Sequence, residues 1–129
     1  MIETVTVLGQ RYNIAQAPAV RQKELLMLTG ARLSLRVLSS NDSEIDSSMI
    51  MGALLTFSEQ DIDRIASIVL SGCVKSGTKE FVDEKTFQGH IHGYFLLMAE
   101  AIKVNLNPFF FWLVSARESQ ADKESQKPE

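Results

Sequence analysis

The residues of this chain that could carry out chemistry are few and scattered. His90 and His92 are its two histidines. On a helix, side chains two positions apart point about 200° away from each other, so these two would not share a metal ion. On a strand they would share a face, but no neighbouring cluster completes a metal site. Cys73, the one cysteine, falls on an apolar helical stripe, which favours a buried hydrophobic role over a nucleophilic one.

Three acidic residues, Glu59, Asp61 and Asp63, alternate in a way that a calcium-binding loop would also show. Their spacing lacks the glycine and the distal glutamate of an EF-hand. Because Ser58 precedes them, we interpret the segment as a capped helix start whose acids complement the helix dipole. There is also no glycine-rich phosphate loop. The sequence therefore predicts no catalytic residues, no cofactor and no metal: a protein that is not an enzyme.

Composition places the chain among ordinary globular proteins. It has 129 residues, 45% of them hydrophobic and 22% charged, which suits one domain with a hydrophobic core. A formal net charge of −3 disfavours nucleic-acid binding. The first residues lack the features of a signal peptide, and no apolar run approaches the roughly 20 residues that span a bilayer. We expect a protein of a reducing cytoplasm without nucleic-acid or membrane partners.

Residues 2–14 predict a β-hairpin. Residues 4–7 alternate and are β-branched, and Gly9-Gln10 can form a two-residue turn. That turn would place Val7 opposite Tyr12 and Val5 opposite Ile14, with all four side chains on one face. Because a lone hairpin is marginally stable in water, it must dock on other elements.

The remainder of the chain is predicted to be mainly α-helical. Residues after Pro18 favour a helix with a possible break at Gly30, although residues 31–38 also alternate like a strand, and this choice stays open. Further helices are expected over about 44–55, 58–72 and 83–104, separated by loops at 39–43 and 71–78. Gly89 and Gly93 lie off the apolar stripe of the last of these helices and could let a neighbouring backbone come close. The predicted fold is an N-terminal hairpin followed by a bundle of about four to five helices.

The most unusual segment is Asn107-Pro108 followed by four aromatic residues and Leu113. Asparagine before proline indicates the start of a last helix. On its wheel Phe109, Trp112 and Leu113 share one face and anchor it, whereas Phe111 points away. Plain core packing remains an alternative for the block as a whole. Our candidate partner-binding residues are Phe110, Phe111, Trp112 and Val114.

The chain is expected to form one domain over residues 1–116. Residues 117–129 mix charges of both signs with serine and glutamine, which predicts a disordered tail. Met27 and Met49–Met51 could line an adaptable groove or simply fill the core.

The layout resembles the tail assembly chaperones of long-tailed, lambda-like bacteriophages. The resemblance covers about residues 2–115 and rests on the hairpin "VTVLGQRYNI", the helical middle and the late segment "FQGHIHGYFLLMAEAIKVNLNPFFFWL". It implies a protein of the infected host's cytoplasm that binds the tape measure protein and keeps it soluble until tail tube subunits polymerise around it. It also implies self-association and, through a frameshift-extended form, recruitment of the tail tube protein. A small helical adaptor or regulatory protein that dimerises through the aromatic helix is the alternative.

Overall fold

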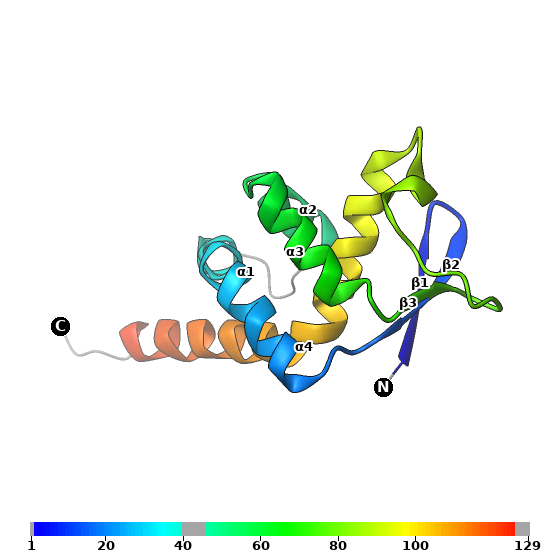
Figure 1. The fold of residues 1–129 in the computed structure, drawn as a ribbon. Helices are drawn as coiled ribbons and strands as arrows, with labels where there is room; N and C mark the ends of the chain where they lie inside the picture. The colour runs from blue at the N-terminus through cyan, green and yellow to red at the C-terminus, as the bar shows by residue number, and fades with distance from the viewer. Residues whose placement is uncertain (1, 40–45, 126–129) are drawn as a thin grey trace.

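The computed structural model describes residues 2–39 and 46–125. Over these residues a small antiparallel sheet lies beside a group of α-helices (Figure 1). The strands are β1 (Ile2–Val7), β2 (Gln10–Ala15) and β3 (Cys73–Lys75), and the helices are α1 (Ala19–Ser39), α2 (Ser47–Leu54), α3 (Glu59–Val69), the 3₁₀ turn η1 (Glu84–Phe87) and α4 (Ile91–Ser125). The expected fold of an N-terminal hairpin followed by helices is confirmed.

The hairpin forms with a different turn from the one expected. Leu8 and Gly9, rather than Gly9 and Gln10, occupy the turn, and both have positive φ (51° and 82°), as a type I′ turn requires. Val5 therefore pairs with Tyr12. The register differs by two residues from the expected one, so each side chain stays on its predicted face. Val7, Tyr12 and Ile14 are buried, and Val5 packs against them.

Leu8 is an unfavourable residue for a positive φ, and its contact with α4 accounts for its place there. A Cβ added to Gly93 would lie 2.7 Å from Leu8 Cδ1 and 2.7 Å from Phe87 Cδ1. The hairpin turn and η1 thus both pack onto the glycine in the first turn of α4. The atoms that approach Gly93 belong to side chains rather than to the expected neighbouring backbone, and nothing lies within 4 Å of a Cβ added to Gly89.

A third strand completes the sheet in the order β1-β2-β3, and Cys73 pairs with Ile14. The expectation that Cys73 continues the face of a helix and that residues 71–78 are a loop is therefore wrong for residues 73–75. A three-residue strand is too short to show a periodicity. β3 forms because it pairs with the free edge of β2, which is far away in the sequence.

The first three helices agree with the sequence patterns in most respects. α1 is continuous, so residues 31–38 are helical and Gly30 causes no break. Ser58 caps α3 by accepting a hydrogen bond from the Asp61 amide at 3.2 Å, which confirms the predicted start. α2 begins at Ser47, later than expected, with Asp46 as its cap. The predicted loop at 39–43 lies outside the described residues except for Ser39, which ends α1.

The end of the chain differs most from expectation. Asp83 starts only the 3₁₀ turn η1, which it caps by accepting from the Lys85 amide at 2.9 Å. A single 35-residue helix, α4, then continues through Pro108, so the expected last helix is the second half of α4. Residues 117–125 of the expected tail are also helical, and residues 126–129 lie outside the described part. Figure 1 shows α4 changing direction and its end (orange to red) extending beyond the other elements.

The first half of α4 forms the centre of the core. Leu97, Met98 and Ile102 are fully buried, and α4 packs against α1, α2, α3, η1 and the hairpin. The sheet joins this core through the Phe87 ring, which lies 6.0 Å from Tyr12 and 6.2 Å from Tyr94 between ring centroids. Burying these side chains is the main stabilising contribution to such a fold.

Candidate functional site

Residues of the segment between β2 and α1 stabilise the bend in α4. Proline has no N–H, so Pro108 cannot donate to the carbonyl of Val104 as a helical residue would. Gln16 Nε2 donates to this carbonyl instead, at 3.0 Å. The buried Asn105 side chain accepts from the Ala17 amide at 2.8 Å and donates to the Ala101 carbonyl at 2.8 Å. These hydrogen bonds therefore fix the direction that α4 takes after Pro108. We call the part of α4 after Pro108 the arm.

The inner face of the arm is buried against the end of α1. Phe110 is only 2% exposed, and Leu113 and Val114 form a small apolar cluster with Val37. Leu113 is an anchor, as predicted. Phe110 and Val114, two of the four candidate partner-binding residues, are occupied by contacts within the chain and are not available as a surface.

The outer face of the arm carries the other two candidates. Phe111 is 76% exposed and Trp112 is 62% exposed. The Phe109 ring stacks on Trp112, with centroids 6.2 Å apart and an angle of 28° between the planes. We call Phe111 and Trp112, with Phe109 beside them, the aromatic ledge.

The exposure of Phe111 agrees with its predicted outward position. The prediction that Trp112 anchors the helix is wrong, because its side chain is exposed. Four successive aromatic residues do not define which side of a helix is buried. Leu113 and Val114 pack on Val37, and Phe110 packs into the main core; these contacts select the buried side.

A second apolar surface lies along α1 and was not recognised in the sequence. Val20, Met27, Leu35 and Leu38 are all exposed large apolar residues. At 100° per residue they fall on one side of the helix, opposite the buried Leu25, Thr29, Leu33 and Val37. We call them the α1 stripe. It extends over roughly 27 Å, at about 1.5 Å per residue. A wheel that marked both apolar sides of α1 could have predicted it.

The ledge and the stripe are carried by elements that touch. Val37 near the end of α1 contacts Leu113 and Val114 of the arm, and Met49 packs against the same cluster. Met27 in the stripe is 80% exposed, so it is not core filling. Exposed large apolar side chains that gather in a patch commonly mark a surface that binds another protein. This arrangement can bind apolar side chains of another protein.

The side chains that could take part in a reaction, Cys73, His90 and His92, lie outside this apolar surface. Cys73 is buried, and burial raises the pKa of its thiol to about 11, so it stays protonated at neutral pH. His90 precedes α4 and its ring lies 6.1 Å from that of His92, edge to face, so the two do not point apart as expected. In the described part of the chain, no three His, Cys, Asp or Glu side chains are grouped as a metal would need.

The described helices include none with the length and apolar character needed to cross a membrane. A family model described as "Phage tail assembly chaperone protein, TAC" matches residues 9–120. This range covers most of the chain, including the α1 stripe and the aromatic ledge. Neither the curated proteins nor the solved structures contain a match to the chain.

Proposed function

The chain belongs to the phage tail assembly chaperone family, and we propose that it binds the tape measure protein through the aromatic ledge and the α1 stripe. In this proposal binding keeps the tape measure protein soluble in the bacterial host's cytoplasm until tail tube subunits polymerise around it. The protein would act without chemical turnover. Recruitment of the tail tube protein by a frameshift-extended form belongs to the same proposal.

The exposure of Phe111 and Trp112 next to each other is the observation that supports this proposal most. A large aromatic side chain that is covered on binding gains about 1.5–3 kcal/mol. Aromatic residues are also enriched among the few residues that dominate binding at protein interfaces. The arm cannot cover its own outer face, because the helix already uses its inner face against Val37. A partner that covers the ledge therefore gains free energy that the isolated chain does not.

The α1 stripe provides a second apolar surface, on the side of α1 opposite its buried residues. A tape measure protein, as the family implies, is long and helical, and its apolar helix faces need cover before assembly. A stripe of roughly 27 Å matches about five turns of a partner helix. The net charge of −3 favours solubility of the complex.

Co-expression with the tape measure protein of the same phage tests the proposal. We expect the wild-type chain to keep that partner soluble and the variant Phe111→Ser/Trp112→Ser to lose most of this effect. Ile2→Ser, which removes an exposed apolar side chain on β1, is the control and should behave like wild type. Equal rescue by the ledge variant and the wild type would rule out the ledge as the binding surface.

Self-association could use the same ledge, as in an adaptor that dimerises through its aromatic helix. Sedimentation of the wild type and of the ledge variant, each alone and with the partner, separates the two uses. If the ledge variant loses self-association but still keeps the tape measure protein soluble, the adaptor alternative describes the ledge better.

A further inference from the structure

Two neighbouring cavities lie between α3 and the start of α4. The larger, about 450 Å³, is lined by α3, by residues 81–84 and by Tyr94. The smaller, about 340 Å³, extends toward Leu55, Phe57 and Ile91. Asp63, Glu84 and Tyr94 line both cavities, so the two lie side by side; together they are called here the acidic groove.

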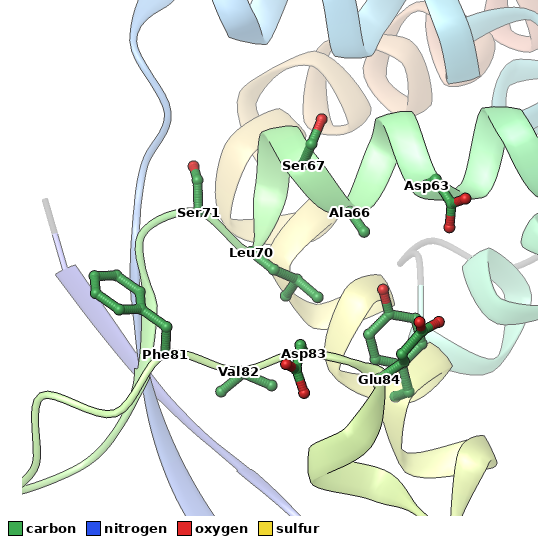
Figure 2. Close-up of a pocket in the computed structure, with 10 residues that line it drawn as sticks. Asp63, Ala66, Ser67, Leu70, Ser71, Phe81, Val82, Asp83 and Glu84 are labelled. Carbon is green, nitrogen blue, oxygen red and sulfur yellow. The ribbon is translucent and has the colours of Figure 1, made fainter.

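The floor of this groove is apolar. Leu70, Val82 and Tyr94 are almost fully buried along it, and in Figure 2 the Leu70 side chain points from α3 toward the segment that carries Val82. Phe81 and Ile91 are exposed large apolar residues that line the larger and the smaller cavity, respectively. The groove can therefore receive apolar side chains along its whole length.

The charged residues of the groove all have one sign. Glu59, Asp63, Asp83 and Glu84 line it, and neither cavity is lined by lysine, arginine or histidine. Asp83 is engaged as the cap of η1. For the other three, the described part of the chain provides no ion pair. Glu59 and Asp63 are also four residues apart on α3, a spacing at which like charges repel each other.

Three of these carboxylates act on a single side chain. The pKa of Tyr94 is raised, first by burial and then by the negative charges of Glu84, Asp63 and Asp83. The negative charges of the groove therefore lie close to Tyr94 at its apolar floor, while the residues that carry them are themselves exposed to solvent.

We propose that the acidic groove binds an amphipathic helix that carries lysine or arginine beside its apolar face. Apolar side chains of such a helix would cover Leu70, Val82 and Tyr94, and its cations would pair with Asp63 and Glu84 at the edge. A neutral or acidic helix would instead leave these carboxylates partly desolvated without a counter-charge. This second site is independent of the aromatic ledge, which lies beyond Pro108 on the other half of α4.

A synthetic peptide of leucine and lysine in amphipathic order, about 14 residues or roughly four helical turns, is a suitable probe. A second peptide with glutamate in place of every lysine controls for apolar binding. The full-length chain with Phe111→Ser and Trp112→Ser is titrated, so that the ledge cannot bind the peptides. Chemical shifts of the backbone amides and the Tyr94 ring report where each peptide binds.

The charge requirement is tested in the same background with two double variants that change the net charge equally. Asp63→Asn/Glu84→Gln removes two carboxylates from the groove, whereas Glu3→Gln/Glu118→Gln removes two exposed carboxylates from β1 and the arm. We expect the lysine peptide to shift Tyr94 and to bind about tenfold more weakly to the groove variant than to the control variant. Added salt should reduce this difference.

Three results would overturn the proposal. The glutamate peptide could bind as tightly as the lysine peptide, or the two double variants could lose equal affinity. Sedimentation could also show that the groove variant loses self-association, while the lysine peptide fails to displace a second copy of the chain from the groove. The occupant of the groove would then be that second copy.

Discussion

Gln16 donates its side-chain amide to the carbonyl of Val104, the one helical acceptor that Pro108 leaves without a backbone donor. The two residues are 88 positions apart in the sequence. Through this bond the segment between β2 and α1 stabilises the bend that directs the arm toward Val37. The orientation of the aromatic ledge therefore depends on a residue from the opposite end of the chain.

Replacing Gln16 by alanine should lower the free energy of unfolding by about 1–3 kcal/mol, because a half-buried carbonyl loses its donor at a point where the helix cannot supply one. Urea denaturation measures this change. Gln10→Ala is the matched control, since the Gln10 side chain donates only to an exposed carbonyl, that of Arg11. Equal losses in both variants would mean that the bond to Val104 contributes nothing specific.

Gly93→Ala should destabilise the protein although alanine is the better helix former by about 1 kcal/mol. The added Cβ would lie 2.7 Å from the Phe87 ring and from the Leu8 side chain, and overpacking of this kind costs about 1–3 kcal/mol. Thermal unfolding measures the change. Gly52→Ala in α2 should be neutral or stabilising by up to about 1 kcal/mol, because its Cβ would meet only the end of the long Arg36 side chain, at 3.2 Å. A stabilised Gly93→Ala variant would show that the turn does not pack there.

Phe110→Ala and Phe111→Ala compare neighbouring residues of the same type on opposite sides of the arm. Truncating the buried Phe110 should cost about 3–5 kcal/mol, the range for emptying an aromatic core position. Truncating the exposed Phe111 should cost less than about 0.5 kcal/mol. Chemical denaturation at low protein concentration keeps the chain from self-associating. Similar losses for the two variants would contradict the orientation of the arm.

Stability should fall as the pH rises above about 9. The pKa of Cys73 is about 11 in the folded protein against 9.0 for an ordinary thiol. The unfolded chain therefore gives up this proton first, and the stability present below pH 9 is lost as the pH approaches 11. Burial also raises the pKa of Tyr12 and of Tyr94, which acts in the same direction.

Denaturation at about pH 8 and about pH 10 measures this slope, and Cys73→Ala should make it shallower. Alkylation provides a second readout. The thiol should react slowly in the native protein and rapidly in urea. Rapid alkylation of the native protein would show that Cys73 is accessible.

Local signals in the sequence predicted those parts of the fold that local interactions determine. The cap at Ser58 and the buried face of the hairpin depend on neighbouring residues, and both were predicted. The Asn107-Pro108 pair was misleading, because proline at a helix start and proline inside a helix look alike until the distant Gln16 is seen to replace its lost donor. β3 escaped notice because it exists only through pairing with β2.

For the candidate site, too, the sequence predicted what depends on local helical geometry and not what depends on distant contacts. Helical geometry correctly separated Phe111 from the core, but four aromatic residues in a row did not reveal that Phe110 packs inward and Trp112 outward. Contacts with residues distant in the sequence make that choice, because Phe110 packs into the main core and Leu113 and Val114 pack on Val37. The α1 stripe was visible in the sequence as a second apolar side of one helix, and the helix-or-strand question over residues 31–38 obscured it.

Trp112 is the chain's one tryptophan, so its fluorescence reports on the aromatic ledge alone. The most direct measurement is the emission spectrum of the wild-type chain during titration with tryptophan-free helical segments of the tape measure protein. We predict a saturable blue shift as the exposed indole ring is covered, and much weaker binding of the same segments to Phe111→Ser/Trp112→Ser in calorimetry. Binding of these segments in calorimetry with no change in Trp112 emission would show that the partner binds elsewhere.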